Sequence, residues 1–355
     1  MSSYAVTFLL AMFVTAVATP VAIKVAPKIG AVDVPRDNRR MHKRPVPRFG
    51  GIAIYLGVLV GFIRLGVWNE QILGLLVGST LILILGIVDD IKGMPAKVKL
   101  AGQIACAAIL YFYTIQIRGM ANVLPWGPWY IAFPKAVAFL VTVLWITGIT
   151  NTINLIDGLD GLAAGITCIA CLSVAYTAYV TNRAETCMLI LGLAGATLGF
   201  LIWNFYPAKI FMGDAGSMLL GYLLASVSLI GDKPTKGTTL FATIIPILIL
   251  ALPIFDTAFA IVRRMAHHKP IMQADKGHLH HRIMAMGFGQ RRTVLALYCI
   301  SAIMGVAGIL WTLHVRLACA VLAVIAGMLI FIFLGIGIVH EPEEKKEDLE
   351  YHEEE

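Results

Sequence analysis

Four polar segments interrupt a chain that is otherwise strongly apolar, and their residue types are those that handle phosphates and divalent cations. They are VDDIKG (residues 88–93), NTINLIDGLDG (151–161), NFYPAKIFMGDAGS (204–217) and HLHHR (278–282). A buried carboxylate is costly unless it is paired or bound to a metal. Carboxylates and nearby cations set between apolar runs therefore indicate a site rather than ordinary loop polarity.

Asp89 and Asp90 stand together at the end of an apolar run. Two adjacent carboxylates can bind a divalent cation, or one of them can act as a base beside a metal. Lys92 and Lys99 follow closely, so the pair also suits a site for a metal and a phosphate. The alternative, a helix end terminated by charge, stays open for these two residues alone.

Asn154, Asp157 and Asp160 are spaced by three residues, and a helical backbone would stack them along one face. Their oxygens are hard ligands of the kind that Mg²⁺ prefers. Gly158 weakens a regular helix at this point and permits the close approach of a ligand. Asp160 could instead be the N-cap of the apolar helix expected to start near residue 162.

Asp214 lies directly after Gly213 at the start of another apolar run. Backbone N–H groups at a helix N-terminus bind phosphate, and Asp214 could hold a metal shared with that phosphate. The alternative for Asp214 is an N-cap. Phe211 could stack on a nucleotide base or serve as a packing residue.

The last segment gathers three histidines and an arginine: His278, His280, His281 and Arg282. This cluster suits phosphate binding better than zinc, because zinc sites usually have wider spacings and no cysteine lies nearby. A densely basic segment, RDNRRMHKRPVPRFGG (residues 36–51), fits attraction to anionic lipid headgroups. Within it, Arg44 and Arg48 could also form a phosphate pocket.

The elements that carry these residues follow from composition. The chain is 59% hydrophobic and only 14% charged, with a mean hydropathy of +0.82, whereas a soluble domain is nearer one quarter charged. The apolar residues fall in blocks of about 17–25, the length that crosses a bilayer as a helix. An all-α polytopic integral membrane protein is predicted, because a backbone in lipid must satisfy its own hydrogen bonds.

Eleven membrane-spanning helices are predicted, at about residues 4–24, 49–66, 72–89, 98–117, 134–151, 161–181, 185–203, 214–231, 238–262, 293–312 and 316–339. No basic segment precedes the first apolar run, which favours an uncleaved first helix with its N-terminus outside. Most of the 28 Lys and Arg residues then fall in cytoplasmic regions, as the positive-inside rule requires. All four polar segments lie on that side and could converge on one cytoplasmic cleft.

Two regions are expected, a membrane-embedded domain over residues 1–340 and an acidic, disordered cytoplasmic tail over residues 341–355. The six cysteines lie in or beside apolar runs, which indicates packing residues rather than disulfides or a zinc site.

Carboxylates for Mg²⁺ and cations for phosphates, set at a lipid boundary, fit phosphoryl transfer between a nucleotide donor and a lipid acceptor. No P-loop and no protein-kinase signature is present. A multi-span transporter is the alternative of a different class. Against it, the polar residues gather at one face of the membrane and no internal repeat is visible.

The motifs PRFGG, VDD, NTINLIDGLDGL, NFYPAKIFMGDAGS and HLHHR carry a resemblance to a known family. In this order they resemble those of the polyprenyl-phosphate N-acetylhexosamine-1-phosphate transferases, over about residues 1–340. The resemblance implies transfer of a sugar 1-phosphate from a UDP-N-acetylhexosamine to polyprenyl phosphate, with release of UMP. It implies Mg²⁺ as the cofactor, with Mn²⁺ as a substitute.

HLHHR and an eleventh span look like the branch of that family that uses UDP-N-acetylglucosamine and undecaprenyl phosphate at the first membrane step of cell-envelope glycopolymer synthesis. The alternative is the muramoyl-pentapeptide branch of peptidoglycan synthesis, which usually reads HHHFE and has ten spans. The resemblance further implies a homodimer in the bacterial plasma membrane with its active site facing the cytoplasm. No nucleic-acid partner is expected.

The resemblance also implies roles for individual residues. The catalytic carboxylates would be Asp89, Asp90, Asp157 and Asp160, and the Mg²⁺ ligands would be Asp214 and Asn154. The substrate-binding residues would be Asn204, Phe211, Gly213, His278, His280, His281, Arg282, Lys99, Arg44 and Arg48. Lys92 lies one position closer to the Asp pair than the family lysine does, so Lys99 is the better candidate for a phosphate ligand.

Overall fold

The computed structural model describes residues 2–35, 44–121, 128, 130–230, 246–266, 278–313 and six positions between 320 and 328. The helices are α1 (Ser3–Val25), η1 (Ala26–Ile29), α2 (Gly50–Leu65), α3 (Glu70–Lys92), α4 (Ala96–Phe112), α5 (Lys135–Ile156), α6 (Leu162–Val180), α7 (Ala184–Asn204), α8 (Gly213–Val227), α10 (Ala251–Ala266), α11 (Leu279–Ala285) and α12 (Gln290–Thr312). The strands are β1 (Val32–Asp33), β2 (Val46–Pro47), β3 (Gly119–Ala121) and β4 (Tyr130–Ala132).

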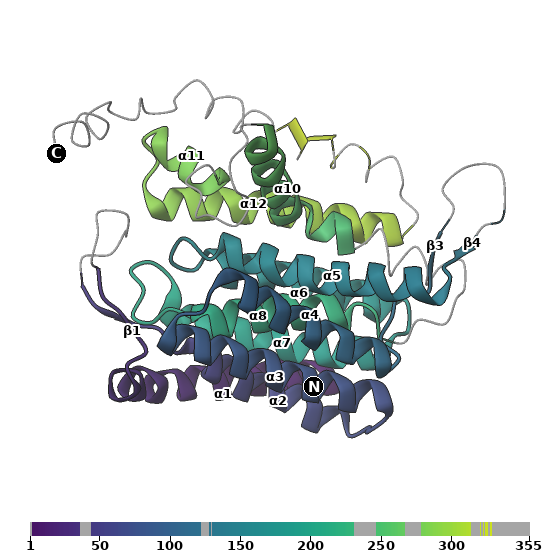
Figure 1. Cartoon of the computed structure of the whole chain (residues 1–355), viewed down its shortest axis with the longest axis horizontal. Coiled ribbons are helices and arrows are strands. Elements are labelled where there is room, and N and C mark those ends of the chain that lie inside the picture. The colour runs from purple at the N-terminus through teal and green to yellow at the C-terminus, as the bar shows by residue number, and fades with distance from the viewer. Residues whose placement is uncertain are drawn as a thin grey trace.

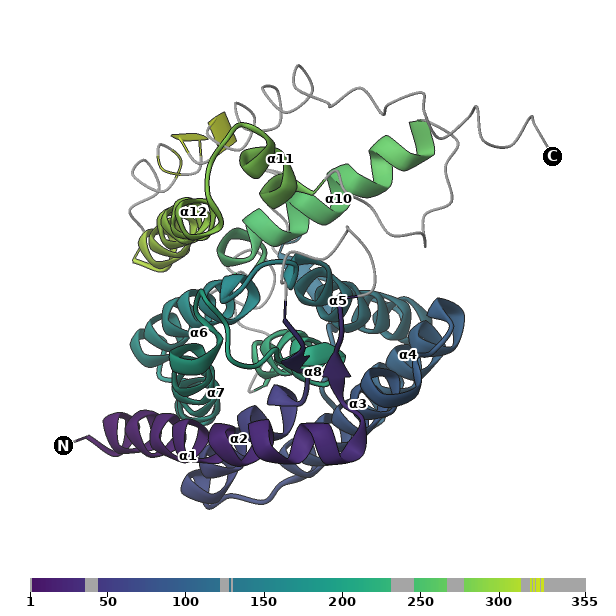
Figure 2. The same cartoon turned by 90° about the vertical axis from the view of Figure 1, so that its left-hand side faces the viewer.

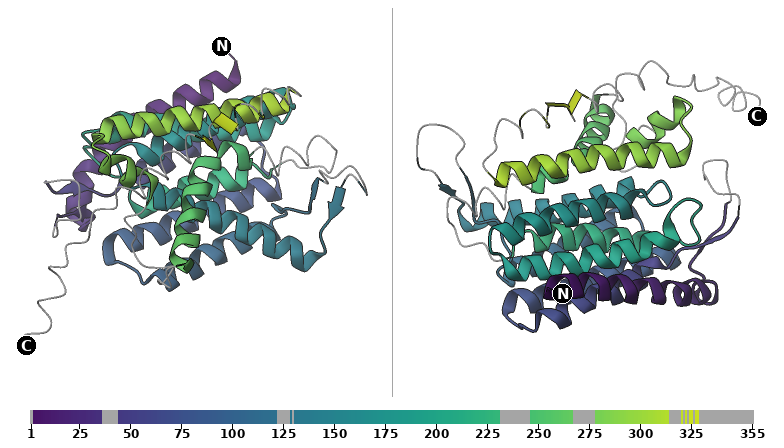
Figure 3. Two further views of the ribbon diagram at one scale, coloured as in Figure 1. Left: turned by 90° about the horizontal axis from the view of Figure 1, so that it is seen from above. Right: turned by 180° about the vertical axis from the view of Figure 1, so that it is seen from behind.

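The helices form a bundle around α8, which lies near the centre when the bundle is viewed along its length (Figure 2). Helices α2, α3, α5, α6 and α7 contact it, α4 packs between α3 and α5, and α1 packs outside α2 and α7. Helices α10, α11 and α12 make a separate layer over α5 and α6 (Figures 1 and 3). Two short antiparallel pairs, β1 with β2 and β3 with β4, lie at opposite ends of the bundle (Figure 1).

Six helices of the described part are long and apolar enough to cross a membrane: α1 with η1, α3, α5, α6, α7 and α12. The shorter helix α2 is also apolar. The chain is therefore a multi-pass membrane protein built of helices, in agreement with the predicted class.

Nine of the predicted spans coincide with helices to within a few residues, from α1 through α8 and again at α12. The span predicted at 238–262 overlaps α10, which begins later. The span predicted at 316–339 lies largely outside the described residues, and the acidic tail at 341–355 lies wholly outside them. The number of eleven spans and their orientation stay predictions.

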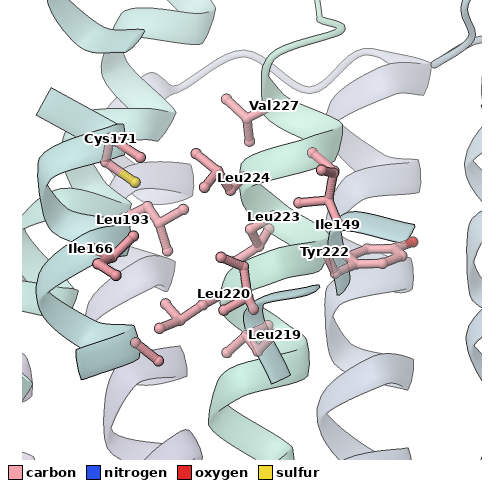
Figure 4. Packing of buried hydrophobic residues seen from close by; sticks show 14 of the residues in the cluster. Ile149, Ile166, Cys171, Leu193, Leu219, Leu220, Tyr222, Leu223, Leu224 and Val227 are labelled. Atoms are coloured by element: carbon pink, nitrogen blue, oxygen red, sulfur yellow. The ribbon is translucent and has the colours of Figure 1, made fainter. Parts of the chain in front are cut away.

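The central helix α8 is buried along its whole length except at Asp214. Figure 4 shows Leu220 and Leu224 of α8 facing Ile166 of α6 and Leu193 of α7. Van der Waals packing, rather than exclusion of water, stabilises such contacts inside a bilayer, because lipid tails are as apolar as leucine. Helix α8 is thus buried except at Asp214 in its first turn.

Candidate active site

Asp214 is the centre of a polar cluster built by four separate segments. Nη2 of Arg48, just before α2, lies 2.6 Å from Oδ2 of Asp214. Nζ of Lys99, on α4, lies 2.7 Å from Oδ1. Nδ2 of Asn154, on α5, donates to the same Oδ1 at 2.6 Å. Residues 166 positions apart in sequence are thus joined directly, and the carboxylate carries two cations and an amide.

Asp90 holds the start of α8. A Cβ on Gly86 would lie 2.3 Å from Cα of Ala215, so only glycine lets α3 approach α8 this closely. One turn later, Oδ1 of Asp90 accepts from the backbone nitrogen of Asp214 at 2.8 Å, and Oδ2 accepts from that of Ala215 at 3.0 Å. Asp90 therefore caps α8 from another helix. Asp214 itself makes no side-chain cap, which settles that alternative.

Arg48 and Lys99 link the carboxylates to one another. Nε of Arg48 lies 3.0 Å from Oδ1 of Asp90. Nζ of Lys99 lies 2.9 Å from Oδ2 of Asp89, whose other oxygen accepts from the backbone nitrogen of Met94 at 2.7 Å. Lys99 thus bridges Asp89 and Asp214. Lys92 is exposed, so Lys99 is the lysine that lies at the cluster.

The loop after α5 carries the next two carboxylates. The helix ends at Ile156 with Asp157 as its C-cap, so the regular stacking expected through Asp160 stops there. Oδ2 of Asp160 accepts from the backbone nitrogen of Ala208 at 2.9 Å. The N-cap position of α6 is Gly161, and Asp160 is not an N-cap.

Asn204 ties this loop to the segment before α8. Its Oδ1 accepts from the backbone nitrogen of Gly161 at 3.1 Å, and its Nδ2 donates to the carbonyl of Ile210 at 2.9 Å. Phe211 is held by the backbone, because its nitrogen donates to the carbonyl of Pro47 at 2.8 Å and its carbonyl accepts from the nitrogen of Gly50 at 3.0 Å. The two loops and the segment before α2 thereby form one surface.

That surface encloses a cavity of about 760 Å³. The predicted site residues that line it are Arg44, Arg48, Asn154, Asp157, Asp160, Asn204, Phe211, Gly213, Asp214 and His281. Asp89, Asp90 and Lys99 do not line it but lie behind Asp214, through the contacts above. The volume and mixed lining suit a nucleotide-sized ligand.

His278, His280 and Arg282 are buried rather than turned to the cavity, although they belong to the same motif as His281. Burial, followed by the neighbouring His281, lowers the pKa of His280 to about 3, so this ring is neutral at physiological pH. Its Nε2 has no hydrogen-bond partner among the described residues.

Sequence reasoning missed several residues of this region. Asp33, Tyr206 and Gln290 also line the cavity. Asp256 of α10 accepts from Nδ1 of His278 at 3.0 Å, and the hydroxyl of Tyr298 donates to the carbonyl of Gly161. A lone carboxylate in the apolar run ALPIFDTAFAIV was the available signal for Asp256. Tyr206 lies in the segment NFYPAKIFMGDAGS, and nothing in the local sequence marked Asp33, Gln290 and Tyr298.

The electrostatics of the cavity are those of crowded carboxylates. Burial, together with the charge on Asp214, raises the pKa of Asp157 to about 7, although Arg48 opposes the shift. Burial lowers the pKa of Arg48, but Asp214 and Asp90 raise it above its usual value, so the guanidinium stays charged. The cavity therefore attracts cations to its carboxylates and presents Arg48 to an anion.

The donor set fits a magnesium ion that is only partly held by protein. Within the described ranges, no group of three or more His, Cys, Asp or Glu side chains is close enough to enclose a metal. Asp214, Asp157 and Asn154 nevertheless line one cavity with hard oxygen atoms. Mg²⁺ commonly binds through one or two carboxylates and completes its shell with waters and substrate phosphates. An Asn amide can offer its oxygen by rotating about its last bond.

Comparison with known proteins shows relatives that match most of the chain. A protein of Bacillus subtilis named probable undecaprenyl-phosphate N-acetylglucosaminyl 1-phosphate transferase is 40% identical over 86% of this chain and 84% of its own length. A decaprenyl-phosphate N-acetylglucosaminephosphotransferase of Mycobacterium tuberculosis is 34% identical over 82% and 78%. A phospho-N-acetylmuramoyl-pentapeptide-transferase of Streptococcus pyogenes is 32% identical over 57% and 64%.

The family model described as glycosyl transferase family 4 matches residues 72–232. That stretch runs from α3 to the end of α8 and holds Asp89, Asp90, Asn154 and Asp214. Because the B. subtilis relative is 40% identical over 86% of this chain and the family model includes Lys99, Asn154 and Asp214, the chain belongs to glycosyl transferase family 4.

Proposed function

We propose that this protein transfers N-acetylglucosamine 1-phosphate from UDP-N-acetylglucosamine to undecaprenyl phosphate, giving undecaprenyl-diphosphate-N-acetylglucosamine and UMP. The observation that carries the proposal is the convergence of Arg48, Lys99 and Asn154 on Asp214 at one cavity. Cations and carboxylates in one place are what transfer between two phosphates requires. The name of the B. subtilis relative supports the donor and the acceptor.

The reaction is a displacement at the β-phosphorus of the donor. An oxygen of the lipid phosphate forms a bond to that phosphorus, and the bond from the phosphorus to the bridging oxygen breaks, so UMP leaves with that oxygen. The acceptor phosphate is largely ionised at neutral pH, so little proton removal is needed. Arg48, which lines the cavity, would stabilise the negative charge on the phosphates, and Lys99 would add its positive charge from behind Asp214. The resemblance to the family supports Asp89, which pairs with Lys99 behind Asp214, as the carboxylate that takes the residual proton of the acceptor.

We infer a magnesium ion held by Asp214 and Asn154, with Mn²⁺ as a substitute. It would neutralise the diphosphate of the donor. Asp157 and Asp160 would face the diphosphate and sugar, and Asn204 and Phe211 the uridine. This assignment is supported by the position of all these residues on the cavity wall.

Membrane placement completes the proposal. The positive-inside rule supports a cavity that faces the cytoplasm, an N-terminus outside and a C-terminus inside, in the plasma membrane of a bacterium. The resemblance to the family supports a homodimer. The muramoyl-pentapeptide alternative is not favoured, because the S. pyogenes relative matches a smaller part of the chain than the B. subtilis one.

The test is transfer of labelled N-acetylglucosamine 1-phosphate from UDP-N-acetylglucosamine to undecaprenyl phosphate by purified protein, with Mg²⁺ or with EDTA. We expect lipid product and UMP with Mg²⁺, none with EDTA, and a loss of about 10²- to 10³-fold in kcat for Asp214→Asn. Glu185→Gln is the matched control, because Glu185 is the acidic residue in the first turn of α7. Absence of product from a protein that binds the UDP-sugar would exclude this acceptor or donor.

A second experiment separates direct displacement from a phospho-enzyme route. Protein incubated with β-³²P-labelled donor and no acceptor should retain no label under direct displacement. Covalent label that disappears in Asp89→Asn would overturn it, because Asp89 would then be a nucleophile.

A further inference from the structure

Asp256 is a carboxylate buried in the middle of α10, and both of its oxygens are bonded to the start of α11. Oδ2 lies 3.0 Å from Nδ1 of His278, and Oδ1 accepts from the backbone nitrogen of Leu279 at 2.8 Å. Asp256 and His278 are each about 6% exposed. A buried carboxylate is costly unless its hydrogen bonds are satisfied, so this arrangement is specific rather than incidental.

These two bonds fix the position of α11 and the orientation of the His278 ring before it. His278 is the N-cap residue of α11 and makes no side-chain cap, so Asp256 supplies the cap from α10 instead. A carboxylate can only accept, so Nδ1 of His278 donates the hydrogen of this bond.

A second contact holds the same short helix from the same face of α10. The guanidinium of Arg282 lies 5.3 Å from the ring centre of Phe259, which is one turn after Asp256. Helix α10 therefore contacts His278, directly before α11, and Arg282, in the middle of α11. Between those two points, His281 is the half-buried residue of the motif that reaches the cavity.

We propose that Asp256 is a positioning residue for the transfer reaction, which acts by holding α11 so that His281 faces the substrate cavity. The inference rests on the proposed function for the identity of the substrate. His278 and Arg282 are then supports rather than substrate contacts, and His281 is the residue of the HLHHR motif that meets the donor. A purely structural Asp256 would affect the fold and the activity independently of His281.

A double-mutant cycle separates these two roles. Asp256→Ala, His281→Ala and the double variant are compared in the full-length protein by kcat and KM for UDP-N-acetylglucosamine. We expect Asp256→Ala to lower kcat/KM by about 10- to 100-fold, as for other residues that orient a ligand-binding side chain. In the His281→Ala background the same change should cost less than about 2-fold. Effects that multiply in full would refute the proposal.

Two further variants test whether the losses of activity in the cycle arise from misfolding. Asp256→Asn keeps one oxygen for the nitrogen of Leu279 and should recover part of the loss. Thr257→Val is the matched control, because Thr257 is the next residue of α10 and its hydroxyl has no hydrogen-bond partner among the described residues. This control should keep wild-type activity. If it falls as far as Asp256→Ala, the effect belongs to α10 in general and the proposal fails.

A readout without activity distinguishes failure of this proposal from failure of the proposed function. A thiol introduced by His281→Cys is labelled with a maleimide in a Cys299→Ser background, because Cys299 is the exposed cysteine of the described residues. Adding Asp256→Ala should change its labelling rate several-fold, whereas Thr257→Val should not. If the wild-type protein transfers no sugar but Asp256→Ala still changes the labelling rate of the thiol at position 281, the proposed function is refuted and the positioning role stands. An unchanged rate would refute the positioning role.

Discussion

The backbone nitrogen of Asp214 lies 2.8 Å from Oδ1 of Asp90, so the carboxylate at the end of α3 caps the helix that carries the central carboxylate of the site. Asp90 uses its other oxygen on Ala215 and also pairs with Arg48. Its side chain is fully buried, while that of Asp214 is 17% exposed toward the cavity. Asp90 therefore holds the start of α8 in place, whereas Asp214 faces the cavity.

Asp90→Asn should lower both activity and stability. An amide can accept at one atom only and carries no charge, so one N–H of α8 loses its partner and Arg48 keeps only its ion pair with Asp214. We expect kcat/KM to fall by about 10²-fold and the midpoint of thermal unfolding in detergent to drop by several degrees. Glu70→Gln removes the same charge at an exposed residue in the first turn of α3 and should alter neither quantity. Equal unfolding midpoints for Asp90→Asn and wild type would contradict the capping role.

Lys99→Met should remove the cation shared by Asp89 and Asp214. Without it, no cation lies between the negative charges of these two carboxylates. A loss of about 10²-fold in kcat/KM is expected. Lys97→Met is the control, because Lys97 is exposed in the first turn of the same helix. Kinetic parameters that match for the two variants would show that Lys99 has no special role.

Gly158→Ala should disturb the wall between the loop after α5 and α11. A Cβ at this position would lie 2.5 Å from Nε2 of His280, so the loop or the ring must shift. We expect activity to fall by about 10-fold, with KM for the donor affected most, because the neighbouring Asp157 and Asp160 line the cavity. Gly148→Ala, on α5, is the control, since nothing lies within 4 Å of its added Cβ. Comparable losses in both variants would rule out a steric effect at His280.

Asp157 makes stability depend on pH. Its pKa is raised to about 7 in the folded protein, chiefly by burial and by the charge on Asp214, and is near 4 in an unfolded chain. Between these values the unfolded chain releases a proton that the folded protein keeps, so rising pH destabilises the fold; below about 4 and above about 7 the effect is constant.

Asp157→Asn removes this dependence. In EDTA, the unfolding midpoint of the variant should therefore rise relative to that of wild type as the pH is increased from 5 to 8. Parallel curves for the two proteins would show that Asp157 titrates at its ordinary value.

The hydrogen bond between Gln103 and Asn151 should hold α4 and α5 in register next to the site. Nδ2 of Asn151 donates to Oε1 of Gln103 at 2.6 Å, one turn below Asn154 on α5 and one turn beyond Lys99 on α4. Gln103→Leu should cost only about 0.6–1.7 kcal/mol of stability, the usual worth of such a bond between membrane helices. It should nevertheless lower kcat/KM by about 10-fold, because Lys99 and Asn154 then lose their common register.

The swapped pair, Gln103→Asn with Asn151→Gln, should restore part of the activity lost in either single variant. This recovery is checked by measuring kcat/KM for the two single variants and the double variant. No loss in Gln103→Leu would mean that the bond holds the helices without setting the site.

The sequence by itself determined the helical membrane class, the approximate limits of most helices and the residues of the central cluster. Apolar blocks of bilayer length leave the backbone only one local solution, and a carboxylate such as Asp214 beside such a block is too costly to be accidental. The motifs around Asp89, Asn154 and Asp214 also carried the resemblance to the family.

Only the tertiary structure decided which residue does what within those motifs. Asp90 rather than Asp214 caps α8, Lys99 rather than Lys92 meets the cluster, and His281 alone of its motif reaches the cavity. Such choices depend on how closely helices approach and how they are rotated, and residues far apart in the chain set both. The role of Asp256 could not be predicted for the same reason. A lone carboxylate in an apolar run does not show which helix it will contact, and here that helix is α11.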